Sequence, residues 1–439
     1  MTRGHAPPPP QDVRIERVGA EGDGAARLGD GTTLYLPGVL PGETVRAHPL
    51  VRRGEGWAAE ATAILAASDA RVVPPCRHFG ACGGCALQHW DDAAYAAWKS
   101  GLLEAALRRA GYAPTVAPLA RTPPGGRRRM DLAARRRGGG VLLGLHRQRA
   151  AEVVDLLECP VLHPALAALL APLRALLGRL AGLQRAGSVM ANLLDSGPDL
   201  LLRTDGELTA PDRARLAAFA TGHGMPRIAW ARGAAAPETA CQLRPAVTRL
   251  GGISVAPPPG AFLQASREGE AAIVAAALAG LPEPLPERLP GGARVVELYA
   301  GCGTLTFALA ARVRVAAFEG DPTATAALGA AANGAGLAGR ITVHRRDLAR
   351  QPLRAAELKG CGAVVLDPPH AGAAPAMPEI AASGVARVIY VSCNPATLAR
   401  DAAVLRAAGY TLLSAVPVDQ FRWSARLESV SVFGRAAQT

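Results

Sequence analysis

Apolar residues occur in short, often interrupted runs near the start of the chain. Between residues 13 and 65, five such runs alternate with glycine and proline turns: Val13–Val18, Ala25–Leu28, Thr32–Leu36, Thr44–Val51 and Trp57–Leu65. Short strands at this spacing are typical of small β-barrels, and OB-like barrels frequently bind oligonucleotides. The pattern predicts a disordered proline-rich tail over residues 1–10 and an OB-like barrel over residues 11–68, with a purely structural barrel as the alternative.

The last third of the chain alternates apolar strands with helices. Its buried runs fit a doubly wound parallel sheet: Val313–Phe318, Val364–Leu366 and Ala386–Val391. Proline-rich stretches mark a boundary and a linker at Pro257–Gly260 and Pro282–Pro290. The middle of the chain mixes helix and strand patterns, with one helix expected at Asp91–Arg109. We therefore expect a mixed α/β central domain over residues 69–260 and a Rossmann-like domain over residues 261–439.

Residues with binding chemistry follow several of these predicted strands. Arg294–Thr304 predicts a strand, a glycine turn and a helix, which lets the backbone approach a nucleotide closely. Glu319 ends the next strand, where its carboxylate can accept hydrogen bonds from both ribose hydroxyls. Asp367 ends a third strand, before two prolines. A glycine turn alone also fits a dehydrogenase, but the acid before two prolines favours an S-adenosylmethionine (AdoMet) methyltransferase.

Cys393 lies where a predicted strand opens into a loop, because Asn394-Pro395 stops the strand. A thiolate is a strong nucleophile once its pKa is lowered; the alternative is a small apolar core thiol. Addition of a thiolate to C6 of uracil makes C5 able to take a methyl group, and a base must then remove the C5 proton. Glu428 enters the final predicted strand and is a candidate for that base, although an ordinary strand-end residue gives the same pattern.

Three cysteines with the spacing C-x5-C-x2-C lie on a glycine-rich stretch, at Cys76, Cys82 and Cys85. Cys159, followed by proline, supplies a distant fourth ligand. Three close cysteines and one distant one resemble iron–sulfur spacing, and a four-thiolate zinc site is the main competitor.

The chain is strongly basic, with a net charge of +12 and a pI of about 9.9. That balance favours a nucleic-acid partner, and seven arginines between Arg121 and Arg137 predict a basic face in the central domain. Only Lys99 and Lys359 are lysines, so part of the arginine content reflects a codon preference. We expect no membrane span, no export signal, no obligate protein partner and a cytoplasmic location.

Taken together, these motifs resemble the RNA uracil-5 methyltransferase family, in particular the bacterial 23S rRNA branch with an N-terminal TRAM barrel and a 4Fe-4S cluster. The resemblance runs from about Val13 to Phe433. It implies that a 4Fe-4S cluster is bound by Cys76, Cys82, Cys85 and Cys159. It assigns the AdoMet and substrate site to Gln264, Tyr299, Thr304, Glu319, Asp347 and Asp367. Cys393 would be the nucleophile and Glu428 the proton acceptor, acting on a uridine in RNA, with a tRNA target as the alternative.

The chain departs from this family's usual pattern at a few positions. Ser266 stands where the family usually has asparagine, and His370 stands where it has arginine. Arg426-Leu427 replaces a histidine-valine pair before Glu428. These differences bear on the choice of substrate and leave the chemistry intact.

Overall fold

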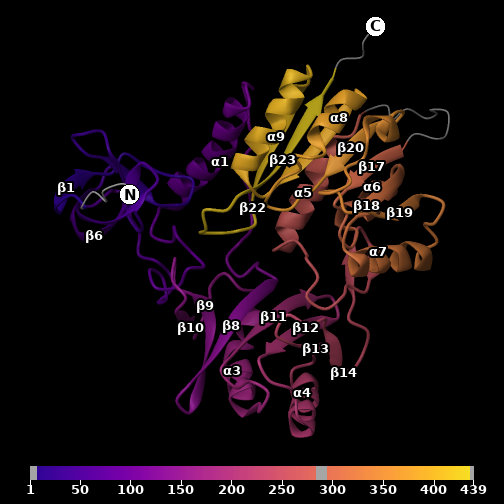
Figure 1. Ribbon diagram of the computed structural model, residues 1–439, viewed down its shortest axis with the longest axis horizontal. Coiled ribbons are helices and arrows are strands. Elements are labelled where there is room, and N and C mark those ends of the chain that lie inside the picture. The colour runs from indigo at the N-terminus through magenta and orange to yellow at the C-terminus, as the bar shows by residue number, and fades with distance from the viewer. Residues whose placement is uncertain (1–6, 283–293, 436–439) are drawn as a thin grey trace, which may run out of the picture.

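The computed structural model describes residues 7–282 and 294–435 of the chain. Figure 1 shows three units: an N-terminal barrel, a central sheet with helices on one side, and a C-terminal sheet between helices. Most of the expected tail (residues 1–6) and nearly all of the expected linker (residues 283–290) lie outside the described residues. No helix in the described ranges is both long and apolar enough to cross a bilayer.

The predicted N-terminal strands form one six-stranded sheet in the order β1-β5-β6-β4-β3-β2. The strands are β1 (Gln11–Arg14), β2 (Arg17–Val18), β3 (Gly24–Arg27), β4 (Thr33–Leu36), β5 (Thr44–Arg53) and β6 (Gly56–Ala66). Strands β1 and β2 are two halves of one bent segment. Because β1 pairs with β5 and β2 pairs with β3, that segment closes the sheet around a core that includes Ile15, Leu34 and Val45.

The central unit is a seven-stranded sheet in the order β10-β9-β8-β11-β12-β13-β14. Its strands are β8 (Arg129–Arg137), β9 (Gly140–His146), β10 (Val153–Asp155), β11 (Ala186–Leu194), β12 (Gly197–Thr204), β13 (Arg227–Arg232) and β14 (Glu238–Gln242). Leucines of three helices cover one face of it: α2 (Pro164–Ala167), α3 (Leu170–Arg179) and α4 (Ala210–Gly222). A hairpin of β15 (Thr248–Leu250) and β16 (Ile253–Val255) follows.

The C-terminal sheet has the order β19-β18-β17-β20-β21-β23-β22-β7, and only β23 runs against the others. Its strands are β17 (Arg294–Leu298), β18 (Arg314–Glu319), β19 (Ile341–Arg345), β20 (Ala363–Leu366), β21 (Arg387–Ser392), β22 (Thr411–Asp419) and β23 (Glu428–Gly434). The helical segments are α5 (Arg267–Ala279), α6 (Thr304–Ala310), α7 (Pro322–Gly334), the 3-10 turn η1 (Ala355–Leu358), α8 (Met377–Ser383) and α9 (Pro395–Ala407). Val364 and Leu366 pack on the α8 and α9 side, whereas Val365 packs on the α5, α6 and α7 side. This alternation gives the predicted doubly wound sheet.

One segment that we expected in the central domain packs on the C-terminal sheet. Helix α1 (Asp92–Arg109) lies beside α9 (Figure 1), and β7 (Ala120–Arg121) pairs with the end of β22. Leu103 and Leu107 of α1 share a core with Leu398 and Leu405 of α9. The chain therefore enters the C-terminal unit, leaves it to form the central sheet and then returns. This path brings the cysteine-rich loop against the C-terminal unit.

Candidate active site

The carboxyl ends of the parallel strands meet at one edge of the C-terminal sheet, which is where ligands bind in such folds. Tyr299 follows β17, Glu319 ends β18, Asp367 follows β20 and Cys393 follows β21. Four residues predicted from separate motifs are therefore gathered along one edge of neighbouring strands. Asp347, two residues after β19, lies at the same edge, where it accepts hydrogen bonds from the amides of Ala349 and Arg350.

The turn after β17 has a backbone that few residues can adopt. Tyr299 has φ +64°, Gly301 +55° and Gly303 +102°. A Cβ atom on Gly303 would lie 2.5 Å from the ring of Phe307, so glycine is required there. Strain at a non-glycine residue such as Tyr299 is characteristic of functional sites. The turn leads directly into α6, which begins at Thr304.

Glu319 is oriented by this turn and by the start of the next helix. Its carboxylate accepts hydrogen bonds from the amides of Gly301, at 2.8 Å, and Asp321, at 2.7 Å. Two backbone donors from different segments fix the direction of the side chain. Glu319 therefore presents a fixed acceptor beside the glycine turn, as a ribose-binding carboxylate requires.

A chain of hydrogen bonds links the two buried carboxyl groups of the site. Nε2 of Gln264 donates to Asp367 at 3.0 Å, and Nε2 of Gln420 donates both to Oε1 of Gln264 at 2.7 Å and to Glu428 at 2.8 Å. Oε1 of Gln420 accepts from the amide of Ala265 at 2.8 Å. The second oxygen of Glu428 is buried and has no hydrogen-bond partner in the part of the chain that is described.

The segment that carries Gln264 is held from the central sheet. Nε of Arg128 donates to the carbonyl of Gln264 at 2.9 Å, and Arg129 donates to the carbonyl of Leu263 at 2.7 Å. Arg128 is buried and pairs with Glu270 of α5 at 2.5 Å. These arginines, which we expected on a basic RNA-facing surface, fix the site backbone instead.

The protonation of the site follows from its burial. Burial raises the pKa of Asp367 to about 7. Burial and the nearby Asp367 raise the pKa of Glu428 well above its ordinary value. Burial, with Glu428 and Asp367 nearby, raises the pKa of Cys393 to about 12, and the positive charge of Arg426 acts in the opposite direction. In the substrate-free protein, at neutral pH, these raised pKa values keep Cys393 as a thiol and favour the protonated form of Glu428.

Cys393 lies between β21 and the N-terminus of α9. Asn394 caps that helix: its side chain accepts from the amide of Ala396 at 3.0 Å and donates to the carbonyl of His370 at 3.0 Å. The amino end of a helix stabilises negative charge, so this position favours the thiolate once a proton acceptor is near.

Two of the departures from the family pattern touch each other here. Nη1 of Arg426 lies 2.6 Å from Nε2 of His370. Two positions that were expected to differ from the family pattern therefore contact each other in this chain. A third departure, Ser266, is buried, caps α5 through the amide of Gly269 and contacts the hydroxyl of Thr122 at 2.6 Å.

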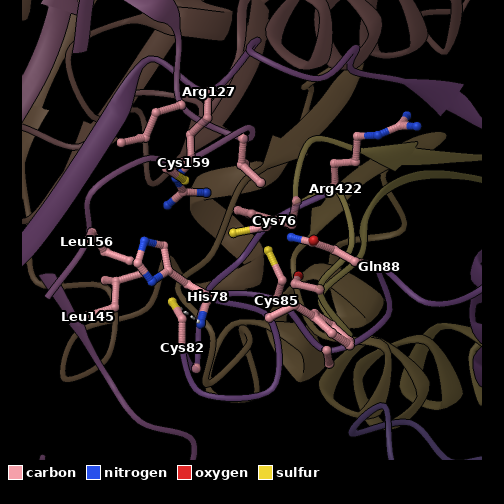
Figure 2. A pocket seen from close by; sticks show the side chains of 18 of the residues that line it. Cys76, His78, Cys82, Cys85, Gln88, Arg127, Leu145, Leu156, Cys159 and Arg422 are labelled. Atoms are coloured by element: carbon pink, nitrogen blue, oxygen red, sulfur yellow. Dashed lines mark hydrogen bonds between the residues drawn. The ribbon is translucent and has the colours of Figure 1, made fainter. Parts of the chain in front are cut away.

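The four predicted cluster cysteines line a single cavity of about 560 Å³ between the cysteine-rich loop and the loop before β23 (Figure 2). Burial raises the pKa of Cys82, Cys159 and, to about 12, Cys85. The amide of Gly84 donates to the sulfur of Cys82 at 3.4 Å. Within residues 7–282 and 294–435, no three histidine, cysteine or acidic side chains converge tightly enough to hold one metal ion.

Two connecting residues were not predicted from the sequence. Gln420 links Gln264 to Glu428, and Lys99 of α1 binds the loop that carries both Gln420 and Glu428. Nothing in the sequence marks Gln420, because its role depends on contacts with Gln264 and Glu428 that form only when the chain folds. Lys99 does stand out, because it is one of two lysines in an arginine-rich chain.

The comparisons with known proteins agree with this geometry. The tRNA (Uracil-5-)-methyltransferase family matches residues 340–435 and the TRAM domain matches residues 10–48. An uncharacterized RNA methyltransferase of Caulobacter vibrioides is 43% identical, over 97% of this chain and 100% of the relative. The 23S rRNA (uracil(1939)-C(5))-methyltransferase RlmD of Halomonas elongata is 35% identical, over 96% of this chain and 88% of the relative.

A solved structure has the same architecture. The tRNA (uracil-54, C5)-methyltransferase of Pyrococcus abyssi, in complex with S-adenosyl-L-homocysteine, superposes with a TM-score of 0.72 at 20% identity. The match covers 96% of this chain and 100% of that protein, and it confirms the predicted TRAM barrel and class I methyltransferase fold. The sequence relationships and the shared fold lead to one conclusion: the chain belongs to the RNA (uracil-5-)-methyltransferase family and is an enzyme that methylates uracil C5 in RNA.

Proposed function

We propose that this enzyme methylates C5 of one uridine in 23S rRNA in the cytoplasm, through a covalent bond between Cys393 and C6 of the uracil. The observation that carries this proposal is the hydrogen-bonded chain from Asp367 through Gln264 and Gln420 to Glu428, at the sheet edge that also carries Cys393. A strong nucleophile and a buried base at one site are what C5 methylation requires.

The residues act in three steps. Cys393 gives its proton to water and its sulfur adds to C6, so that the electrons of the C5=C6 bond make C5 nucleophilic. When bound, AdoMet would supply the methyl group to C5 and would leave as S-adenosylhomocysteine. Glu428 then removes the C5 proton, the C5=C6 bond re-forms and the bond from C6 to sulfur breaks, which releases Cys393. The target base has to leave its stack to reach this buried site.

Gln264 and Asp367 are well placed to hold the uracil ring. The amide of Gln264 can exchange its hydrogen bonds with Asp367 and Gln420 for bonds to the ring. Glu319, Tyr299 and Thr304 surround the glycine turn and fit the ribose end of AdoMet, and Asp347 lies beside them. The strained backbone of Tyr299 supports a site where the backbone meets a ligand.

We propose a 4Fe-4S cluster, bound by Cys76, Cys82, Cys85 and Cys159, in the cavity that they line. Four thiols around one cavity of about 560 Å³ leave room for a cluster, whereas a zinc ion would need the four sulfurs to converge on one point with Zn–S bonds of about 2.3 Å. The cluster would hold the loop in place, since methyl transfer itself needs no electron. Iron and sulfide analysis with visible absorption tests it: brown protein with both elements is expected, and colourless protein with stoichiometric zinc rejects it.

The 23S rRNA target rests on the relative from Halomonas elongata, which is named for that substrate. A tRNA uridine is the second candidate, because the similar Pyrococcus structure is a tRNA enzyme and its match extends over the barrel as well. Mapping of 5-methyluridine in rRNA and tRNA from a strain lacking this gene separates them. Loss of one 23S rRNA position supports the proposal, and loss in tRNA alone contradicts it.

A further inference from the structure

The loop between β22 and β23 carries both members of the proton-removal machinery. Gln420 lies at its start, and Glu428 lies at its end as the first residue of β23. The loop contains almost no regular structure, and Trp423 within it has φ +60°. A loop of this kind keeps two side chains in register only when something outside it fixes its ends.

Lys99 of α1 supplies that fixation. Its side chain is fully buried, and Nζ donates to Oδ1 of Asp419 at 3.0 Å and to the carbonyls of Phe421, at 3.5 Å, and Arg426. Nζ of Lys99 therefore lies within reach of three oxygens, one before Gln420, one just after it and one two residues before Glu428. A single side chain connects the two ends of the loop.

The neighbouring residue on the same helix face completes the contact. The hydroxyl of Tyr95, one turn before Lys99, donates to the other oxygen of Asp419 at 2.8 Å and accepts from the amide of Trp423 at 2.8 Å. The carbonyl of Trp423 in turn accepts from the amides of Ala86 and Leu87, which follow the cysteine-rich loop. The loop is therefore held from α1 and from the cysteine side.

The identity of the residue supports a specific role. The chain has 48 lysines and arginines, of which only Lys99 and Lys359 are lysine. The compact ammonium of lysine carries three rotatable donors on a flexible stem, whereas arginine presents its donors in one rigid planar fork. Lys359 is exposed and lies after η1, so it provides a matched comparison.

We propose that Lys99 is a positioning residue for proton removal: it holds the loop so that Gln420 keeps Glu428 directed at C5 of the methylated uracil. This inference rests on the proposed function, in which Glu428 removes the C5 proton after methyl transfer. Cys393 follows β21, and among the described residues Lys99 makes its hydrogen bonds to the loop before β23 and not to Cys393. The loop reaches the substrate site through Gln420, which bonds both Gln264 and Glu428. Loss of Lys99 therefore slows the release of Cys393 from the RNA more than it slows the formation of the bond.

The experiment compares wild type with Lys99→Met, which keeps the length of the side chain and removes its charge, and with Lys359→Met as the matched control. Labelled rRNA fragment and AdoMet are mixed with each protein. The covalent protein–RNA adduct is followed on denaturing gels, and methylated RNA is measured in the same samples. We expect Lys99→Met to form the methylated adduct at close to the wild-type rate and to release it about 10- to 100-fold more slowly. Lys359→Met should behave as wild type.

Lys99→Met leaves Asp419 buried without its partner, so that variant can lose stability for reasons unrelated to catalysis. The double variant Lys99→Met/Asp419→Asn removes both charges and restores folding while the carbonyls of Phe421 and Arg426 stay without their donor. Slow adduct release in this folded variant supports the proposal. Wild-type release in it, or equal losses of formation and release, overturns the proposal.

Glu428→Gln, tested in parallel, separates this inference from the proposed function. If Glu428→Gln accumulates adduct and the folded Lys99 variants do not, the role of Lys99 is wrong and the role of Glu428 stands. If Glu428→Gln forms no adduct, the assignment of the base fails, and the role of Lys99 in proton removal fails with it.

Discussion

The proposed nucleophile and the proposed base are held in different ways. Cys393 is attached directly to the end of β21, a buried central strand, and its position follows from the sheet. Glu428 begins β23 but depends on Gln420, on Gln264 and on α1, which are far away in the sequence. The side proposed to form the covalent bond is therefore built locally, and the side proposed to break it again is assembled from several parts of the molecule.

This difference separates what the sequence could predict from what it could not. Cys393, Glu319 and Asp367 each follow an apolar strand, so pattern and motif together place them at one edge, and the structure agrees. The bond from Gln420 to Gln264 spans 156 residues and the ion pair from Lys99 to Asp419 spans 320. No local pattern encodes such contacts, because they exist only after the chain has folded.

The domain order was harder to predict for the same reason. The helix at α1 was expected, and its boundaries agree within one residue. Its packing on α9, however, depends on matching leucines some 300 residues away. The sequence pattern around the helix does not reveal that contact, so the helix was assigned to the domain nearest in sequence. The cysteine spacing could be recognised in the sequence. That the loop before β23 lines the same cavity as those cysteines could not be predicted from it.

The largest expected effect comes from the locally built side. Cys393→Ala should lower methylation by more than about 1000-fold, because no other residue can form the bond to C6. Binding of AdoMet, measured by calorimetry, should remain close to wild type. Cys361→Ala, at a buried thiol away from the sheet edge, is the control and should keep its activity. Substantial methylation by Cys393→Ala would show that this residue is not the nucleophile.

A smaller loss is expected on the assembled side. Glu428→Gln should slow turnover by about 100- to 10,000-fold while methyl transfer to the bound base continues.

In wild type, the raised pKa values of Glu428 and Cys393 mean that the carboxylate of Glu428 and the thiolate of Cys393 become more populated as pH rises. The single-turnover rate should therefore increase with pH from 6 upward. Rapid quench at several pH values measures this, and a rate that falls as pH rises through that range contradicts it.

The contact between His370 and Arg426 joins the two sides. His370→Arg places two guanidinium groups together, and Arg426→His removes the charge that favours the Cys393 thiolate. We expect each single change to lower kcat/KM by about 10-fold, and the double exchange to recover most of that loss. A double-mutant cycle measures the coupling. Additive losses would mean that the two residues act independently.

The smallest effect concerns stability. Burial raises the pKa of Glu297 to about 8, so the folded protein holds a proton on this carboxyl that the unfolded chain releases near pH 4. The contribution of this group therefore destabilises the fold as pH rises from about 4 to about 8. Between pH 5 and pH 8, this carboxyl should lower the free energy of unfolding of wild type by on the order of 2–4 kcal/mol. Glu297→Gln should remove that loss. Urea denaturation at both pH values measures the difference, and an unchanged pH dependence would contradict it.

The most direct test of the covalent mechanism is to identify the bond itself. Glu428→Gln is incubated with AdoMet and target RNA, digested with protease and nuclease, and analysed by mass spectrometry. The account predicts a peptide joined through the sulfur of Cys393 to a uridine that already carries the C5 methyl group. Methylated RNA with no linked peptide, or a link through any other residue, would contradict it.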